Sequence, residues 1–266
     1  MQTMMENRPC PSCGSADTAF LGEVQKTMHQ QFSFERFSMQ RCPSCEMIFL
    51  GQELARDDFA AMYEQSLQFD GSVYRDQETI RIAKEYYGSC YRKLISEIGT
   101  VPTDARVLEV GAGRAWMCMV ADEIGKAIAV AQDVTAECAT ECPWVDIYVV
   151  GEITDPRIRE FGPYDVISIT HVIEHVPQPV KFLAALRSLL HERGRMFVTA
   201  PHRPRGWSHG SPMSEWETWS LNHVPGHLQY FSERAMQVAA NDSGMQLVGW
   251  SLHEEGEAFE AILSRT

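Results

Sequence analysis

Residues Ala105–Trp116, with the sequence ARVLEVGAGRAW, are the starting point for the fold. Arg106–Val110 is a short run of mainly β-forming residues that leads directly into the turn Gly111-Ala112-Gly113. A helix is expected to follow this turn and to end at about Ile124. Glycines let a ligand approach the backbone, and the first turn of a helix presents free N–H groups. The stretch therefore predicts a strand, a tight turn and a helix that together bind a ligand.

The turn differs from two common nucleotide-binding loops. Trp116 stands where the dinucleotide fingerprint G-x-G-x-x-G has its third glycine, and no Lys-Ser or Lys-Thr pair follows as in a P-loop. A nicotinamide-dependent dehydrogenase is therefore a disfavoured alternative.

Further strands and helices alternate along the chain. Strands are expected at residues 127–131, 145–150, 165–170 and 194–200, with a closing antiparallel pair at 244–252 and 257–264. Helices are expected at 57–68, 76–98, 179–190 and 233–243. This alternation predicts an α/β fold with a parallel sheet covered by helices on both faces.

Four polar or glycine positions are expected at the carboxyl ends of these strands, where ligands of such sheets bind: Gly111, Asp133, Glu152 and His171. Asp133 lies 20 residues after Gly113, and a carboxylate there can accept hydrogen bonds from both hydroxyls of a ribose. Its alternative role is to cap a following helix. The expected ligand is a nucleoside with a free ribose.

Five motifs in combination resemble the class I S-adenosylmethionine-dependent methyltransferases: VLEVGAG (Val107–Gly113), AQDVT (Ala131–Thr135), GEI (Gly151–Ile153), YDVISITHVIEHV (Tyr164–Val176) and GHLQYFS (Gly226–Ser232). The resemblance covers the chain from about Tyr74 to its C-terminus. It implies a Rossmann-like sheet of seven strands in the order 3-2-1-4-5-7-6, with the last strand antiparallel. With its N-terminal cysteine motifs, the chain resembles a subgroup of bacterial methyltransferases that modify sugars or other small molecules.

The resemblance also implies a set of cofactor-binding residues at strand ends and on the glycine turn: Glu109, Gly111, Ala112, Gly113, Asp133, Glu152, Ile153, Thr170 and His171. In this assignment the glycine turn carries the methionyl part of the cofactor, and Asp133 holds the ribose diol. Glu109 orients either the cofactor's amino group or the glycine turn itself.

The remaining assignments concern the adenine and the sulfonium. Glu152 would accept a hydrogen bond from the adenine N6 amine, and the Ile153 N–H would donate to a ring nitrogen. Members of the family usually carry Asp where Glu152 stands. Thr170 and His171 would line the methionine and sulfonium side.

Methyl transfer from a sulfonium is an in-line displacement, so the enzyme aligns donor and acceptor and removes at most one proton. Two histidines are predicted to be catalytic: His175, after the fourth strand, and His227, after a long loop. The alternative for His175 is packing. The alternatives for Glu174 are a helix cap or a ligand for a divalent cation.

The long loop, residues 201–226, contains three tryptophans and three histidines. A loop of this length in a compact domain is usually functional, so it is expected to cover a ring-shaped or sugar-like acceptor. The alternative is a loop packed on itself. His223 and His227 are four residues apart, but Pro225-Gly226 between them argues against the helix that a metal-binding pair would need.

Two identical tetrapeptides near the N-terminus, Cys10-Pro11-Ser12-Cys13 and Cys42-Pro43-Ser44-Cys45, supply four thiols. Two such C-x-x-C turns complete the tetrahedral set that structural Zn²⁺ prefers. Buried or redox-active cysteines are the alternative. Aromatic residues between the turns favour a two-stranded hairpin with a register shift near Glu35-Arg36, carrying Phe32, Phe34, Phe37 and Met39.

The charge of the chain limits its partners. Lys and Arg total 23 and Asp and Glu total 36, a formal net charge of −13, which disfavours binding to a phosphate backbone. An RNA methyltransferase that binds RNA through its zinc ribbon is therefore only an alternative to a small-molecule enzyme. A second alternative is an inactive interaction protein that binds the cofactor. No apolar run reaches the length of a membrane span, and no signal peptide is evident, so a cytoplasmic location is expected.

The sequence thus predicts three parts: a zinc ribbon at residues 1–50, linking and capping helices at 51–100, and a methyltransferase domain at 101–266. The expected reaction is methyl transfer from S-adenosylmethionine to a small molecule such as a sugar nucleotide or a ring metabolite. The acceptor atom and the oligomeric state are not predicted.

Overall fold

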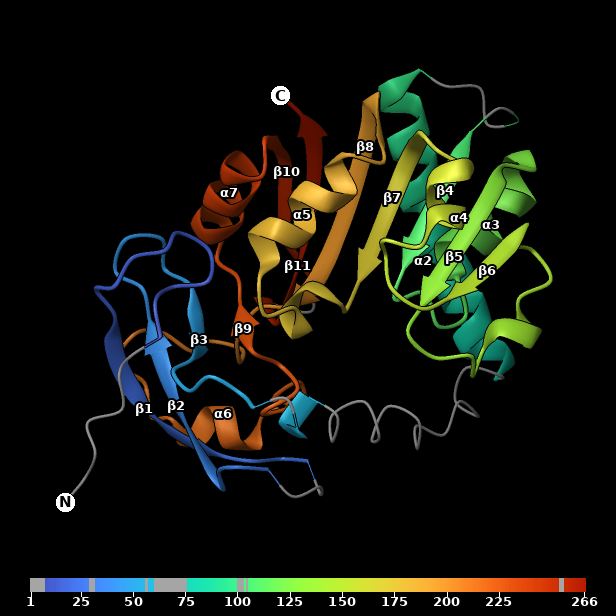
Figure 1. Cartoon of the computed structure of the whole chain (residues 1–266). Helices are drawn as coiled ribbons and strands as arrows, with labels where there is room; N and C mark the ends of the chain where they lie inside the picture. Colours follow the sequence, from blue (N-terminus) through green and yellow to red (C-terminus); the bar gives the residue numbers. More distant parts are fainter. Residues whose placement is uncertain are drawn as a thin grey trace.

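A computed structural model describes residues 8–28, 32–55, 57–59, 76–99, 103, 105–253 and 256–266. It contains two sheets, a large one of seven strands and a small one of four (Figure 1). Across the described residues, no helix combines the length and apolar character that a membrane crossing requires.

The seven-stranded sheet has the order β10-β11-β8-β7-β4-β5-β6. Its strands are β4 (Arg106–Val110), β5 (Ile128–Asp133), β6 (Ile147–Val150), β7 (Tyr164–Thr170), β8 (Leu190–Pro201), β10 (Met245–His253) and β11 (Ala258–Arg265). Neighbours from β6 to β8 are parallel, and β11 is antiparallel to both β8 and β10. Numbered along the chain, this is the order 3-2-1-4-5-7-6, so the predicted fold is confirmed.

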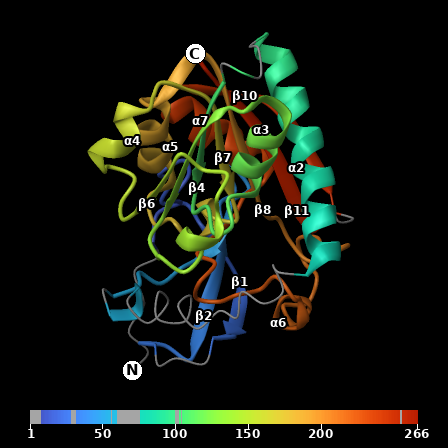
Figure 2. The ribbon, with the colours of Figure 1, turned by 90° about the vertical axis from the view of Figure 1, so that its right-hand side faces the viewer.

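Helices cover both faces of this sheet (Figure 2). One face packs against α4 (Pro156–Glu160), α5 (Pro179–Arg187) and α7 (Glu233–Asp242), and the other against α2 (Gln77–Ile98) and α3 (Trp116–Gly125). Strand β4 is buried between the layers: Leu108 and Val110 belong to the first core and Val107 to the second.

Helix α2 is capped at both ends. The Asp76 side chain accepts a hydrogen bond from the Thr79 N–H, and Gly99 ends the helix with φ 66°. The predicted range 76–98 is therefore confirmed. The expected helix at 57–68 lies largely outside the described residues.

The small sheet has the order β1-β2-β3-β9, with β1 (Ala19–Gln25), β2 (Arg36–Arg41), β3 (Ile48–Leu50) and β9 (Gln229–Tyr230). We call it the ribbon sheet. Its fourth strand comes from the segment between β8 and α7, so the ribbon sheet joins this segment to the N-terminal strands. The domain boundaries at residues 50 and 100 stay a prediction. Strand β9 belongs by sequence to the predicted methyltransferase domain, but it pairs with the N-terminal strands.

The N-terminal hairpin differs from its prediction in two ways. The first strand begins at Ala19, and Phe32 and Phe34 precede β2 instead of lying in a strand. The register shift lies between Phe20 and Gly22, because Gly22 adopts φ 151° and has no side chain to collide with Met213. At Arg36 the register is regular.

The long loop after β8 packs on the ribbon sheet. It contains α6 (Ser214–Thr218), and its three tryptophans, Trp207, Trp216 and Trp219, are buried against Phe37 and Leu50. The tryptophans therefore fill a core with the ribbon sheet, and the expectation that the loop covers an acceptor stays a prediction. The His223–His227 segment is not helical, as predicted.

Candidate functional site

The glycine turn connects the end of β4 to α3. Gly111 and Gly113 adopt φ values of 60° and 47°, which favour glycine, and the Ala112 N–H donates to the Gln132 carbonyl (2.9 Å). A Cβ on Gly111 would lie 2.3 Å from Val172 Cγ2, whereas a Cβ on Gly113 would meet nothing within 4 Å. Gly111 thus permits contact with the segment after β7, and Gly113 leaves the backbone open to a ligand.

Asp133, at the end of β5, holds this turn. One carboxylate oxygen accepts from the Gly113 N–H (2.9 Å), and the other accepts from the Thr135 N–H (3.0 Å). The second bond closes a turn, and only a short 3₁₀ helix, Ala139–Glu141, follows. Asp133 therefore orders the loop, while half-burial leaves the carboxylate accessible to a ligand.

Glu109 lies beneath the turn and is 3% exposed. Its carboxylate accepts from the Cys118 N–H (3.0 Å) at the start of α3. Burial raises the pKa of Glu109 to about 7, although hydrogen bonds from backbone N–H groups oppose the shift. This hydrogen bond supports the start of the helix that follows the turn, and the two implied roles of Glu109 stay predictions.

The other predicted cofactor residues lie at neighbouring strand ends. Glu152 is exposed after β6, next to Ile153, and the Gly151 N–H donates to the Asp133 carbonyl (2.9 Å). Thr170 ends β7, with a buried hydroxyl that has no hydrogen-bond partner among the described residues. Strands β4, β5, β6 and β7 are parallel, so their carboxyl ends lie at one edge of the sheet (Figure 1). All nine predicted residues lie at or just after these strand ends.

Sequence reasoning missed one contributor to this edge. The Tyr148 hydroxyl, on β6, donates to the Gly113 carbonyl (2.8 Å). The sequence does not predict this contact, because the position of the Tyr148 hydroxyl depends on the register between β5 and β6.

Beyond β7, three histidines surround one buried carboxylate. Glu174 Oε1 lies 3.5 Å from His171 Nδ1, 3.9 Å from His175 Nε2 and 3.9 Å from His227 Nε2. The Glu174 side chain is 0% exposed, and the His175 side chain is 41% exposed. His171 adopts φ 53°, a conformation that side chains other than glycine rarely hold without support from their surroundings.

His227 reaches this cluster because its segment is bonded to the turn after β7. The His175 Nδ1–H donates to the Gly226 carbonyl (2.8 Å), and the Leu228 N–H donates to the Glu174 carbonyl (2.8 Å). The Gln229 amide donates to the carbonyls of Ile173 and Val176. Gln229 was missed as a positioning residue, although it lies within the GHLQYFS motif.

The charges of the cluster follow from its burial. Burial raises the pKa of Glu174, but the neighbouring imidazoles of His171, His175 and His227 outweigh it and lower that pKa to about 2. Burial lowers the pKa of His227 to about 3. Glu174 is therefore an anion at pH 7 and His227 a neutral imidazole.

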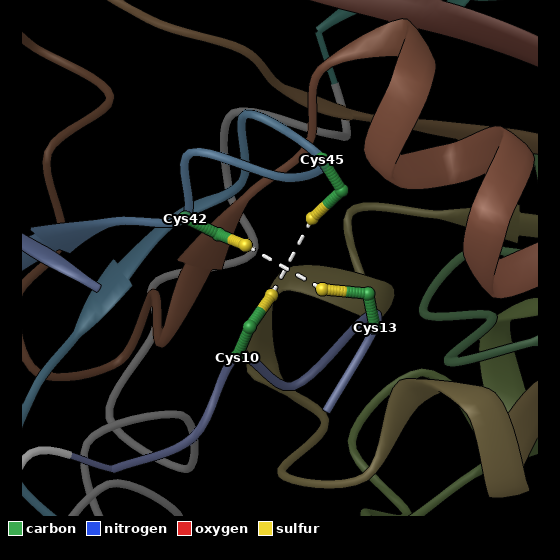
Figure 3. Close-up of side chains that lie close together, drawn as sticks. All are labelled: Cys10, Cys13, Cys42 and Cys45. Atoms are coloured by element: carbon green, nitrogen blue, oxygen red, sulfur yellow. Dashed lines mark hydrogen bonds between the residues drawn. The ribbon is translucent and has the colours of Figure 1, made fainter. Parts of the chain in front are cut away.

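The four N-terminal cysteines converge on one point (Figure 3). Cys10 Sγ lies 3.5 Å from Cys45 Sγ, and Cys13 Sγ lies 3.4 Å from Cys42 Sγ. Sulfur atoms bound to one Zn²⁺ at about 2.3 Å lie about 3.8 Å apart, so the set fits a tetrahedral ion. The cluster agrees with the predicted zinc site.

The cysteine turns also contact the large domain. The Ser232 hydroxyl donates to the Cys45 carbonyl (2.8 Å), and the Ser12 hydroxyl donates to the Ala235 carbonyl (2.7 Å), at the start of α7. Strand β3 pairs with β9, and the Leu50 N–H donates to the Leu228 carbonyl (2.9 Å). The ribbon sheet therefore supports the segment that carries His227.

Residues 83–249 match a family model described as a methyltransferase domain. The chain belongs to this methyltransferase family. The ubiquinone biosynthesis O-methyltransferase of Xanthomonas axonopodis pv. citri (strain 306) is 26% identical over 176 residues, which are 62% of this chain and 73% of the relative.

Solved methyltransferases share its fold. One is Burkholderia thailandensis 1,6-didemethyltoxoflavin-N1-methyltransferase with bound 1,6-didemethyltoxoflavin and S-adenosylhomocysteine (15% identity, TM-score 0.55, 89% of this chain and 98% of that one). Another is CalO1, a methyltransferase in calicheamicin biosynthesis with bound S-adenosylhomocysteine (18% identity, TM-score 0.50, 78% and 61%). The prediction of an S-adenosylmethionine-dependent methyltransferase is confirmed at this level.

Proposed function

We propose that this methyltransferase moves the methyl group of S-adenosylmethionine to a small-molecule acceptor held beside the Glu174 cluster. The observation that supports it is the contact between Gly111 and Val172. This contact brings the cofactor turn against the segment that leads into Ile173–His175. A donor on the turn and an acceptor at the histidines would then be neighbours, as in-line transfer requires.

On the donor side, Gly111, Ala112 and Gly113 would carry the methionyl part, and Asp133 would hold the ribose hydroxyls. Glu152 and the Ile153 N–H would bind the adenine. Thr170, whose hydroxyl has no hydrogen-bond partner among the described residues, and His171 would line the methionine side of the cofactor. The open backbone at Gly113 supports this arrangement, because a Cβ there would point into free space.

On the acceptor side, His175 and His227 are the proposed catalytic residues. An acceptor hydroxyl or amine would lose its proton to one imidazole as its oxygen or nitrogen bonds to the methyl carbon. The carbon–sulfur bond breaks, and S-adenosylhomocysteine leaves. The Glu174 carboxylate would stabilise the imidazolium so formed, because it lies within 3.9 Å of both rings.

A small acceptor agrees with the recessed position of the cluster. Glu174 and His227 are buried, and His175 is the partly exposed member. The acidic chain disfavours RNA. The relatives named above act on a toxoflavin precursor or in ubiquinone biosynthesis, which also favours a ring metabolite.

We further propose that the four cysteines hold structural Zn²⁺. Hydrogen bonds from the backbone N–H groups of Cys45 and Ser44 and from Cys13 outweigh the effect of burial and lower the pKa of Cys42 to about 7, which favours the thiolate. The ion would hold the two cysteine turns together, and with them the N-terminal strands against α7 and β9.

The test is transfer of label from tritiated S-adenosylmethionine into a fractionated host extract. Label in the small-molecule or glycan fraction, lost in Asp133→Ala, is the expected result and provides the acceptor for identification. Label in RNA would overturn the choice of acceptor class. No transfer to any fraction, together with tight binding of S-adenosylhomocysteine, would favour the inactive cofactor-binding alternative.

A further inference from the structure

The Glu174 cluster has a feature that proton transfer alone does not require. Three imidazole nitrogens lie within 3.9 Å of one carboxylate oxygen, yet the separations of 3.5 to 3.9 Å are too long for good hydrogen bonds. Neither oxygen of the buried Glu174 has a hydrogen-bond partner among the described residues. A buried carboxylate without partners is costly, and a cation between the rings would compensate it.

We propose that Glu174, His175 and His227 bind a divalent transition-metal ion. One ligand atom from each lies within 4.8 Å of the other two. Ligand atoms bound to one ion at 2.0–2.2 Å lie about 3 to 3.5 Å apart, so small side-chain rotations would complete the site. Two imidazoles and a carboxylate suit Zn²⁺, Co²⁺ or Mn²⁺ better than Mg²⁺ or Ca²⁺, which prefer oxygen ligands.

The surroundings hold the ligands in place before an ion binds. The Gly226 carbonyl fixes the tautomer of His175, since Nδ1 must carry the proton and Nε2 then presents its lone pair toward Glu174. Such a bond to the second ring nitrogen accompanies most metal-binding histidines. The Leu228 N–H bond to the Glu174 carbonyl holds the backbone next to His227 against the turn that carries Glu174.

The ion's role in catalysis rests on the proposed function, whereas its binding does not. A bound acceptor with a hydroxyl beside a second oxygen would chelate the ion, which lowers the pKa of that hydroxyl. The proton passes to solvent water, the oxygen bonds to the methyl carbon, and the carbon–sulfur electron pair remains on S-adenosylhomocysteine. With the ion present, the imidazoles act as ligands, so the ion takes the place of the imidazole base in the proposed function.

The experiment is a Co²⁺ titration of the full chain with zinc already in its ribbon, without donor or acceptor. The expected result is one Co²⁺ per chain in addition to the zinc, with the visible absorption of nitrogen and oxygen ligands. Glu174→Gln should weaken Co²⁺ binding by more than about 100-fold, since even outer-shell changes cost 10 to 100-fold. His223→Ala is the matched control and should bind as the original chain does: its ring is 5.0 Å from that of His227, outside the ligand set.

Several outcomes would overturn the proposal: no Co²⁺ beyond the zinc, thiolate-to-cobalt absorption with an unchanged metal count, or equal affinity in Glu174→Gln. If Glu174→Gln does not fold, His175→Ala replaces it, because that side chain is 41% exposed and its loss disturbs packing less. Methyl transfer is assayed separately. Metal binding without transfer would then contradict only the proposed function, and transfer without metal binding would contradict only the metal site.

Discussion

Gly111 and Val172 are packed so closely that the glycine has no room for a side chain: a Cβ would lie 2.3 Å from Val172 Cγ2. The two residues belong to different halves of the site. Gly111 is part of the cofactor turn, and Val172 precedes the Ile173–His175 turn of the histidine cluster. Their contact therefore fixes the spacing between the proposed donor and acceptor positions.

Gly111→Ala and Gly113→Ala form a matched pair that separates packing from ligand approach. Both place alanine at a positive φ, which costs about 1–2 kcal/mol. Gly111→Ala should lose about 1–3 kcal/mol more because of the Val172 clash, and Gly113→Ala should not. Thermal unfolding measures both effects.

Binding of S-adenosylhomocysteine, measured by calorimetry, should fall in both variants for different reasons. Gly113→Ala fills the space that the ligand needs, whereas Gly111→Ala displaces the turn. Val172→Ala combined with Gly111→Ala should recover part of the lost stability. Equal stability of the two single variants would show that the Val172 contact is not tight in solution.

Asp133→Asn should weaken S-adenosylhomocysteine binding at least about tenfold, because charge-assisted hydrogen bonds of about 1.5–3 kcal/mol are lost. Asp146→Asn is the control, since Asp146 also accepts a backbone N–H bond (from Ala129, 2.7 Å) but at the opposite end of β5. It should change stability and leave the affinity unaltered. Equal loss of affinity in both variants would point to a general weakening of the sheet.

Most of the large sheet could be predicted because its signals are local. The glycine turn, the alternation of strands and helices, and the closing antiparallel pair each depend on neighbouring residues. The start of α2 at Asp76 and its end at Gly99 follow from capping chemistry. The cysteine cluster is predictable for the same reason, because each C-x-x-C tetrapeptide is a local motif and two of them supply the four ligands of one ion.

The missed features depend on contacts between distant segments. Strand β9 is only two residues long, too short for an alternating pattern to predict it. Its partner β3 lies about 180 positions earlier in the chain. The sequence does not reveal that the ribbon sheet has a buried apolar face, so it does not predict the core in which Trp216 lies. His175 and His227 were singled out separately, and only the fold shows that they share Glu174.

Cys42→Ser should destabilise the whole chain and not the ribbon alone. Losing a thiolate ligand removes most of the zinc affinity, and the N-terminal segment supports β9 and α7 through Leu50, Cys45 and Ser12. Zinc content should fall to near zero and the melting temperature by several degrees. Cys90→Ser, on α2 and outside the cluster, should retain the zinc. An unchanged melting temperature after zinc loss would mean that the ribbon folds independently of the large domain.

Glu109 should make the stability of the chain depend on pH near neutrality. Burial raises its folded pKa to about 7, above the ordinary value of 4.5, so folding favours the protonated acid. The resulting stabilisation is complete below about pH 4.5 and is lost as pH rises to about 7. Over this range the native chain should lose up to about 3 kcal/mol relative to Glu109→Gln, which stays neutral.

Denaturant unfolding of both proteins at a series of pH values, in zinc-containing buffer, measures this difference and cancels the pH dependence of the ribbon. Glu109→Gln keeps an oxygen acceptor for the Cys118 N–H, so the start of α3 should remain intact. A difference in stability that stays constant between pH 5 and 8 would mean that Glu109 is already ionised when folded.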